Sequence, residues 1–204
     1  ELVNMLMRKR SPSSRDALVA LATKRYGMAA SNHVLEAWST FSKAYTEFPY
    51  HTGFLYDGPM QLGPANPLYA KPTGYHATMV GFPYDDIARW RAVYPSEVLA
   101  GQLEKVATRW EPGLDSFALA ARIADTPEHK LNVEEDVRLA RAAWLHIASA
   151  ANQARFIIAR DECTTATQPA TRELKVEIIK LIANDEIDLA RQMFELTRHD
   201  SRIG

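Results

Sequence analysis

Cysteine is almost missing from this sequence, which contains Cys163 and no other. A single thiol cannot build a disulfide framework or a cysteine-rich zinc site, and it leaves the redox compartment open. Long apolar runs are missing too, since no stretch approaches the roughly 20 residues that a membrane-spanning helix needs. Lys and Arg number 24 against 25 Asp and Glu, and the net charge of −1 gives the chain no general attraction to nucleic acid or an anionic membrane. The sequence therefore argues against nucleic-acid and membrane partners without assigning a compartment.

Apolar residues recur with helical spacing over residues 13–48. Ser13 and Ser14 are suited to cap a first helix, and Gly27 is suited to the position just past its end. A second helix carries one apolar face with spacings of four, three, four and three, formed by Val34, Trp38, Phe41, Tyr45 and Phe48. Pro49 follows directly and is expected to end it.

Residues 49–83 have a different composition, because proline and glycine recur throughout. That density of helix breakers predicts a long loop without helices. The aromatic content is too high for a disordered linker, so we expect an ordered loop with short extended pieces at residues 54–56 and 77–80. Ordered loops of this length are uncommon and often functional.

Residues 84–204 again show helical periodicity. Asp85 or Asp86 is suited to cap a short helix over residues 87–93, and a longer helix is expected to open at residues 95–96 and to kink or break at residues 112–113. Further helices are predicted after Asn132 and from about Thr167, with Pro169 near the first helical position. The expected core residues are Trp38, Phe41, Tyr45, Trp110, Trp144, Ile147, Ile178 and Met193.

The predicted fold class is all-α: a helical bundle with three long C-terminal helices, a shorter N-terminal helical pair and a long Gly/Pro-rich ordered loop. We expect a single helical domain over residues 1–204, divided into N-terminal helices (1–48), an irregular loop zone (49–83) and a long-helix bundle (84–204). The chain begins at Glu1 without an initiator methionine, so we expect it to be a fragment of a larger protein.

No motif for catalysis, metal binding or cofactor binding is visible. The carboxylate clusters at residues 85–86 and 134–136 both lie at predicted helix starts, where capping explains them. The six histidines are scattered without metal-ligand spacing, and the two Gly-Pro steps lack the N–H donors of a phosphate-binding loop. We therefore assign no catalytic, metal-binding or cofactor-binding residue.

The loop zone carries the strongest local signal for a ligand or an interface. Tyr56 and Tyr69 offer flat apolar faces with hydroxyl tips, and Asp57, Gln61 and Asn66 offer planar hydrogen-bonding groups. Such a mixture suits a sugar ring or a partly polar domain interface. The alternative is that the aromatic residues only pin the loop onto the helices.

Several segments resemble the region that follows the catalytic (β/α)8 barrel in glycoside hydrolases. They are residues 34–44 (VLEAWSTFSKA) running into Phe48 and Pro49, residues 58–66, residues 80–86 (VGFPYDD) and residues 198–204 (RHDSRIG). Pro67 departs from the pattern, which has an aliphatic residue there. In barrel glycosidases the catalytic carboxylates lie at strand ends. This chain shows no strand–helix alternation, so no catalytic residue is carried over.

The resemblance implies a non-catalytic C-terminal accessory domain of a carbohydrate-active enzyme. Such a domain packs on the barrel of its parent chain and can shape the substrate cleft, with carbohydrate as a second candidate partner. It predicts an exposed apolar face with the loop zone beside it. Two alternatives stay open: a free-standing helical protein-interaction module, and a small helical enzyme with its own pocket.

Overall fold

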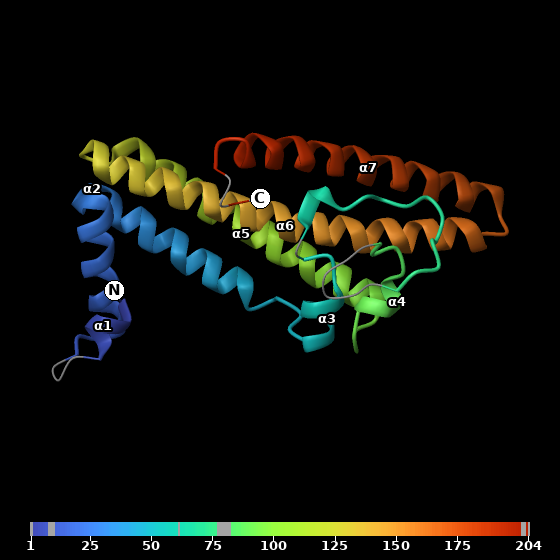
Figure 1. Ribbon diagram of the computed structural model, residues 1–204, viewed down its shortest axis with the longest axis horizontal. Helices are drawn as coiled ribbons and strands as arrows, with labels where there is room; N and C mark the ends of the chain where they lie inside the picture. Colours follow the sequence, from blue (N-terminus) through green and yellow to red (C-terminus); the bar gives the residue numbers. More distant parts are fainter. Residues whose placement is uncertain (1, 8–10, 61, 77–82, 201–202, 204) are drawn as a thin grey trace. The chain divides into compact units, whose positions relative to one another are not determined.

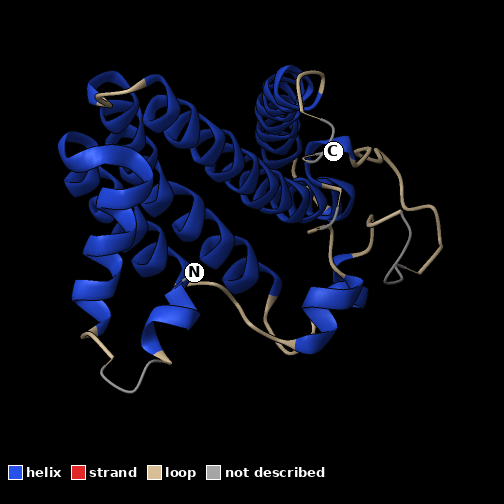
Figure 2. Ribbon diagram, turned by 60° about the vertical axis from the view of Figure 1, so that its left-hand side comes forward, coloured by secondary structure: helices blue, strands red, loops and turns tan. Residues whose placement is uncertain are grey.

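The computed structural model describes residues 2–7, 11–60, 62–76, 83–200 and 203. Within these residues the chain forms α-helices and one 3-10 helix, and no β-strand is present (Figures 1 and 2). The helices are α1 (Leu2–Leu6), α2 (Ser14–Tyr45), α3 (Thr52–Asp57), the 3-10 helix η1 (Gly63–Ala65), α4 (Ile87–Trp90), α5 (Ser96–Ile123), α6 (Pro127–Thr165) and α7 (Pro169–Thr197). None of the described helices is both long enough and apolar enough to cross a membrane. The all-α prediction is confirmed, including its three long C-terminal helices.

Two compact units are built from segments that lie far apart in the sequence. Unit 1 comprises Glu1–Thr46 and Arg109–Arg141, and unit 2 comprises Glu47–Thr108 and Ala142–Gly204. Helices α5 and α6 each contribute one part to each unit. A division of the chain into consecutive zones therefore does not follow the boundaries of these units.

Helix α2 begins and bends where the sequence predicts. The Ser13 side chain accepts a hydrogen bond from the Asp16 amide at 3.1 Å, which caps the helix. Gly27 has φ 84° and ψ 160°, outside the helical region, so two helical segments meet there. Its left-handed backbone favours glycine, and a Cβ at this position would also meet His129 Nδ1 at 2.7 Å.

The core of unit 1 is centred on small residues of α2. The buried stripe is formed by Ala22, Tyr26, Ala30, Val34, Ala37, Phe41 and Ala44. Tyr45 lies one position beyond it and is 51% exposed, so the prediction that Tyr45 is buried was wrong. Trp38 and Trp110 are half-buried at the edge of this core, and Phe41 is buried as predicted. The prediction centres the buried stripe on the aromatic residues, whereas four of its seven residues are fully buried alanines.

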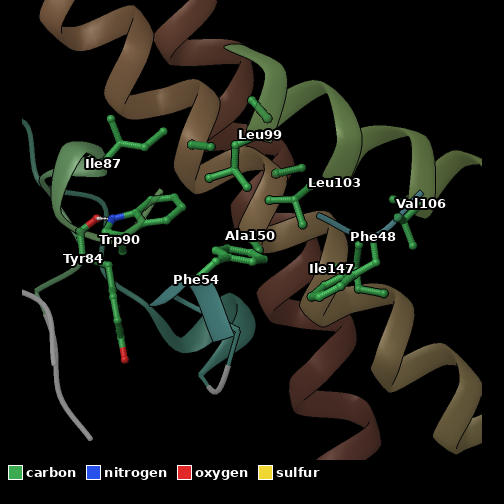
Figure 3. Packing of buried hydrophobic residues seen from close by; sticks show 14 of the residues in the cluster. Phe48, Phe54, Tyr84, Ile87, Trp90, Leu99, Leu103, Val106, Ile147 and Ala150 are labelled. Carbon is green, nitrogen blue, oxygen red and sulfur yellow. Dashed lines mark hydrogen bonds between the residues drawn. The ribbon is translucent and has the colours of Figure 1, made fainter. Parts of the chain in front are cut away.

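The core of unit 2 combines loop residues with the long helices, as Figure 3 shows. Trp90 is fully buried, and its indole N–H donates to the Tyr84 carbonyl at 3.2 Å. Phe54 is fully buried beside it, with ring centroids 6.2 Å apart. Of the residues predicted to be buried here, Ile147 is buried, whereas Trp144, Ile178 and Met193 are half-buried.

The loop zone contains helical turns that we did not predict. Residues 54–56, predicted to be extended, lie in α3, and residues 63–65 form η1. Gly53 lies in the first turn of α3, where the His51 side chain accepts from its amide at 3.0 Å, and Gly58 ends this helix. Pro64 lies at the start of η1, where its missing N–H costs no hydrogen bond. The extended piece predicted at residues 77–80 lies outside the described residues.

Of three predicted helix boundaries, one is confirmed, one is shifted and one is absent. Helix α7 starts at Pro169, as predicted. Helix α6 starts at Pro127 rather than after Asn132, because the Thr126 hydroxyl accepts from the His129 amide at 3.1 Å and caps the chain earlier. Helix α5 continues through Pro112, so the predicted break does not occur.

Candidate ligand and interface surfaces

The loop zone is tied to α6 by polar side chains that point out of this helix. Arg160 is 5% exposed, and its guanidinium donates to the Tyr69 carbonyl at 3.1 Å and to the Asp85 carbonyl at 2.8 Å. Gln153 donates to the Asn66 carbonyl at 3.3 Å. These carbonyl groups accept hydrogen bonds from side chains of α6 instead of from a helical backbone. Buried backbone groups require such partners.

The five residues predicted to face a ligand or an interface differ in their surroundings. Tyr56 is 52% exposed on α3, and Asp57 at the end of α3 is half-buried. Tyr69 is half-buried, Asn66 is buried, and Gln61 lies outside the described residues. Their role in contacting a ligand or a second domain therefore stays a prediction.

Asn66 has a defined structural contact. Its Nδ2 donates to the Pro59 carbonyl at 3.2 Å, across the turn that contains η1. Its Oδ1 is buried and has no hydrogen-bond partner. The side chain therefore closes the turn internally.

An apolar groove is lined by residues of the loop zone and of α7, and η1 contacts that helix. It consists of two hollows of about 410 and 300 Å³ that share Pro64 and Ala190. We call it the α7 groove, and its lining residues are Leu62, Pro64, Ala65, Asn66, Leu68, His146, Ala183, Glu186, Ile187, Ala190, Met193, Phe194, Thr197 and Ile203. Ile187 and Phe194 are 49% and 62% exposed, which leaves large apolar side chains at its rim.

Glu186 is a buried carboxyl group in this groove. Oε1 accepts from the Ser149 hydroxyl, and Oε2 accepts from Asn152 Nδ2 at 3.1 Å. Burial raises the pKa of Glu186, and the two hydrogen bonds oppose that shift. The group therefore retains its proton at a higher pH than an exposed glutamate does.

His146 is the second titratable group in the groove. Its Nδ1 is buried without a hydrogen-bond partner, and a Cβ on Gly63 would lie 2.6 Å from that nitrogen. Gly63 also has φ +50°, so both the backbone and the space favour glycine at this position. Burial lowers the pKa of His146, against a raising contribution from the Met60 backbone. Burial beneath the η1 turn thus favours the neutral form of the imidazole.

Arg160, Glu186 and His146 are not among the residues predicted from the sequence. A signal was present for two of them, because Arg160 continues the buried register of Ala154 and Ile157, and Glu186 lies between the buried Ile182 and Leu189. A charged residue on a buried helical face must be paired or neutral. Nothing in the spacing distinguishes His146. Among the described residues, no group of three or more His, Cys, Asp or Glu could hold a metal ion.

Comparison with known proteins gives no relative. No family model matches the chain, and no curated protein or solved structure matches it. The resemblance to the region after a glycoside hydrolase barrel therefore stays a prediction from the sequence.

Proposed function

We propose that this chain is a non-catalytic helical accessory domain that docks through the α7 groove onto a larger catalytic domain. The catalytic domain that the sequence resemblance favours is the (β/α)8 barrel of a carbohydrate-active enzyme. The observation that carries the docking part of the proposal is the groove itself: two adjoining apolar hollows with Ile187 and Phe194 exposed at the rim. Contiguous apolar surface of this kind is typical of an interaction site.

The position of the groove supports a domain contact. One wall is a long helix and the other is a turn whose backbone is held by Asn66 and Gln153. A rigid surface of this kind loses little conformational entropy when a partner binds. The accessory-domain hypothesis expects an apolar face with the loop zone beside it, and the α7 groove has that arrangement.

The titratable groups of the groove favour binding over chemistry. The two carboxylate oxygens of Glu186 accept hydrogen bonds from Ser149 and Asn152, so that carboxyl is already engaged. His146 Nδ1 lies beneath Gly63 rather than facing a hydroxyl or thiol. A nucleophile needs a base within hydrogen-bond reach and access to its substrate. The Ser149 hydroxyl donates to Glu186 but is fully buried, and His146 Nδ1 has no such partner.

The test is to produce the polypeptide encoded directly upstream in the same reading frame as a separate protein and to titrate it with this chain by calorimetry. We expect a (β/α)8 barrel that binds the chain, and Ile187→Glu should weaken binding at least about tenfold. The matched control is Leu181→Glu, because Leu181 is 65% exposed on α7 but does not line the groove.

Two outcomes would count against the proposal. One is an upstream reading frame without a barrel, which would favour the free-standing interaction module. The other is turnover of chromogenic glycosides by the isolated chain that persists on repurification and disappears in Asp86→Asn. That result would favour a small helical enzyme.

A further inference from the structure

A polar hollow of about 290 Å³ lies elsewhere in unit 2, away from the α7 groove. Its walls come from the turn at residues 72–76, from Asp85 to Arg89 at the start of α4, and from Arg160 and Asp161 of α6. None of these residues lines the α7 groove. Asp and Arg contribute five of its nine lining residues, whereas apolar residues form most of the α7 groove.

Two of the residues that line this hollow, Arg160 and Asp85, are buried and hydrogen-bonded. Arg160 donates to the Asp85 carbonyl at 2.8 Å, and the Asp85 carboxylate accepts from the amide and the hydroxyl of Thr73. The Thr73 hydroxyl in turn accepts from the Tyr75 amide at 3.3 Å. This chain of hydrogen bonds fixes the turn that carries Tyr75, whose side chain is nevertheless 71% exposed. An aromatic ring is therefore presented to solvent from an anchored backbone.

Four of the five Asp and Arg residues that line the hollow form two ion pairs, and the carboxylate of the fifth, the buried Asp85, accepts hydrogen bonds from Thr73. Arg89 Nε lies 3.4 Å from Asp86 Oδ2, and the Arg160 guanidinium lies 2.8 Å from Asp161 Oδ1. An anion would meet the two carboxylates, and a cation would meet the two guanidinium groups. An uncharged ligand with several hydroxyl groups can instead donate to the carboxylates and accept from Arg89 without separating a pair.

We propose that this hollow binds one ring of a neutral saccharide, which packs on Tyr75 and hydrogen-bonds to Asp86, Arg89 and Asp161. The apolar C–H face of a pyranose matches an exposed aromatic ring, and its hydroxyl rim matches the paired charges. The volume of about 290 Å³ lies just below the roughly 300–1,000 Å³ usual for ligand pockets, which suits a single ring. This inference does not depend on the proposed docking function, because the isolated chain contains every residue that it uses.

The test is a titration of the isolated chain, followed by saturation-transfer NMR, with the methyl glycosides of glucose, galactose, mannose, xylose and N-acetylglucosamine. We expect saturable binding of at least one of them, and Tyr75→Ala should weaken it about tenfold or more. Tyr50→Ala is the matched control, because Tyr50 is also 71% exposed in unit 2 but does not line the hollow. Arg89→Gln should weaken binding about threefold to tenfold, whereas the exposed Arg191→Gln should leave it unchanged.

The substituted side chains are exposed, and circular dichroism of each variant verifies that it folds. Absence of saturation by all five glycosides up to about 100 mM, far weaker than a useful site, would overturn the inference. Equal effects of Tyr75→Ala and Tyr50→Ala would overturn it too. Competition by inorganic phosphate or by Mg²⁺ would contradict the matching of charges on which the choice of a neutral ligand rests. Because no barrel is present in this experiment, its failure leaves the docking proposal untouched.

Discussion

The two compact units solve the problem of burying a core in different ways. In unit 1, helices pack on helices: the Phe41 ring stacks on Trp110 with centroids 4.3 Å apart and meets Phe117 at 5.4 Å. In unit 2, an irregular segment supplies part of the core, with Phe54 and Trp90 both fully buried. In unit 1 the backbone groups form their hydrogen bonds within helices. In unit 2 the carbonyl groups of the irregular segment need hydrogen-bond donors from elsewhere.

Buried polar residues reflect this difference. Among the described residues of unit 1, the buried polar side chains are Ser31 and Ser116, and each donates to a carbonyl of its own helix. The corresponding residues of unit 2 are Asn66, Asp85, Ser149, Asn152, Gln153, Arg160 and Glu186. The contrast shows that a loop can enter a core when long polar side chains from a neighbouring helix replace the missing regular hydrogen bonds.

The largest expected effect tests this polar anchoring of unit 2. Arg160→Ala leaves the carbonyls of Tyr69 and Asp85 without their buried donor, and we expect it to lower the free energy of unfolding by about 3–5 kcal/mol. The control is Arg155→Ala on the same helix, which removes an exposed ion pair to Glu104 and should cost about 1 kcal/mol or less. Urea denaturation followed by circular dichroism measures both. Equal costs would mean that the anchoring contributes little.

The next effect tests the close packing of unit 1. A Cβ at Gly113 would lie well inside contact distance of the Phe41 ring, so Gly113→Ala should cost about 1–3 kcal/mol. Gly101→Ala is the matched control on the same helix α5, because nothing lies within 4 Å of the added atom there. It should be neutral or stabilise by up to about 1 kcal/mol through its better helix propensity. Thermal denaturation measures the stability of both variants. A Gly113→Ala variant as stable as the wild type would contradict the tight contact between residue 113 and the Phe41 ring.

A smaller effect distinguishes two hypotheses for the predicted loop residues: contact with a ligand or an interface, and a purely structural role in the loop. Asn66→Ala removes the donor to the Pro59 carbonyl, and we expect a loss of roughly 1–2 kcal/mol in the free energy of unfolding. Tyr56→Ala removes an exposed ring and should change stability by less than about 0.5 kcal/mol. Chemical denaturation measures both variants. If Asn66→Ala leaves the free energy of unfolding unchanged, the result would favour a ligand-facing role of Asn66 over a structural one.

The smallest effect concerns the pH dependence of stability. Because burial raises the pKa of Glu186 above its ordinary 4.5, the native state binds this proton more tightly than the unfolded chain does. The contribution of Glu186 to stability is therefore greatest below pH 4.5 and is lost as the pH rises through the folded-state pKa. Glu186→Gln should remove this loss, so its stability relative to the wild type should increase as the pH rises through the folded-state pKa of Glu186.

The measurement is the difference in unfolding free energy between Glu186→Gln and the wild type at several pH values. Taking the difference removes the opposite contribution of His146, whose lowered pKa makes stability fall as the pH drops below 6.5. Glu173→Gln, at an exposed position of α7, is the control. A difference that stays constant with pH would contradict the buried, proton-retaining carboxyl.

The spacing of apolar residues and the capping residues at helix ends were sufficient to predict most of the helices. The caps at Ser13 and Asp86, the bend at Gly27 and the start of α7 at Pro169 depend on one or two neighbouring residues, so the sequence reveals them. The same reasoning went wrong at Tyr45 and at residues 54–56. The centre of a helical face is set by which partner approaches it, and an isolated helical turn between breakers is stabilised by the residues on which it packs.

The sequence by itself determined the all-α class, the three long helices and the presence of an unusual Gly- and Pro-rich segment, because each follows from local backbone preferences and the spacing of apolar residues. Only the tertiary structure decided that Asn66 turns inward, that Arg160 and Glu186 are buried, and that the surface beside Tyr75 is hollow. These features arise where residues far apart in the chain meet. No local propensity encodes such meetings, since burial and hydrogen bonding depend on what the fold brings alongside.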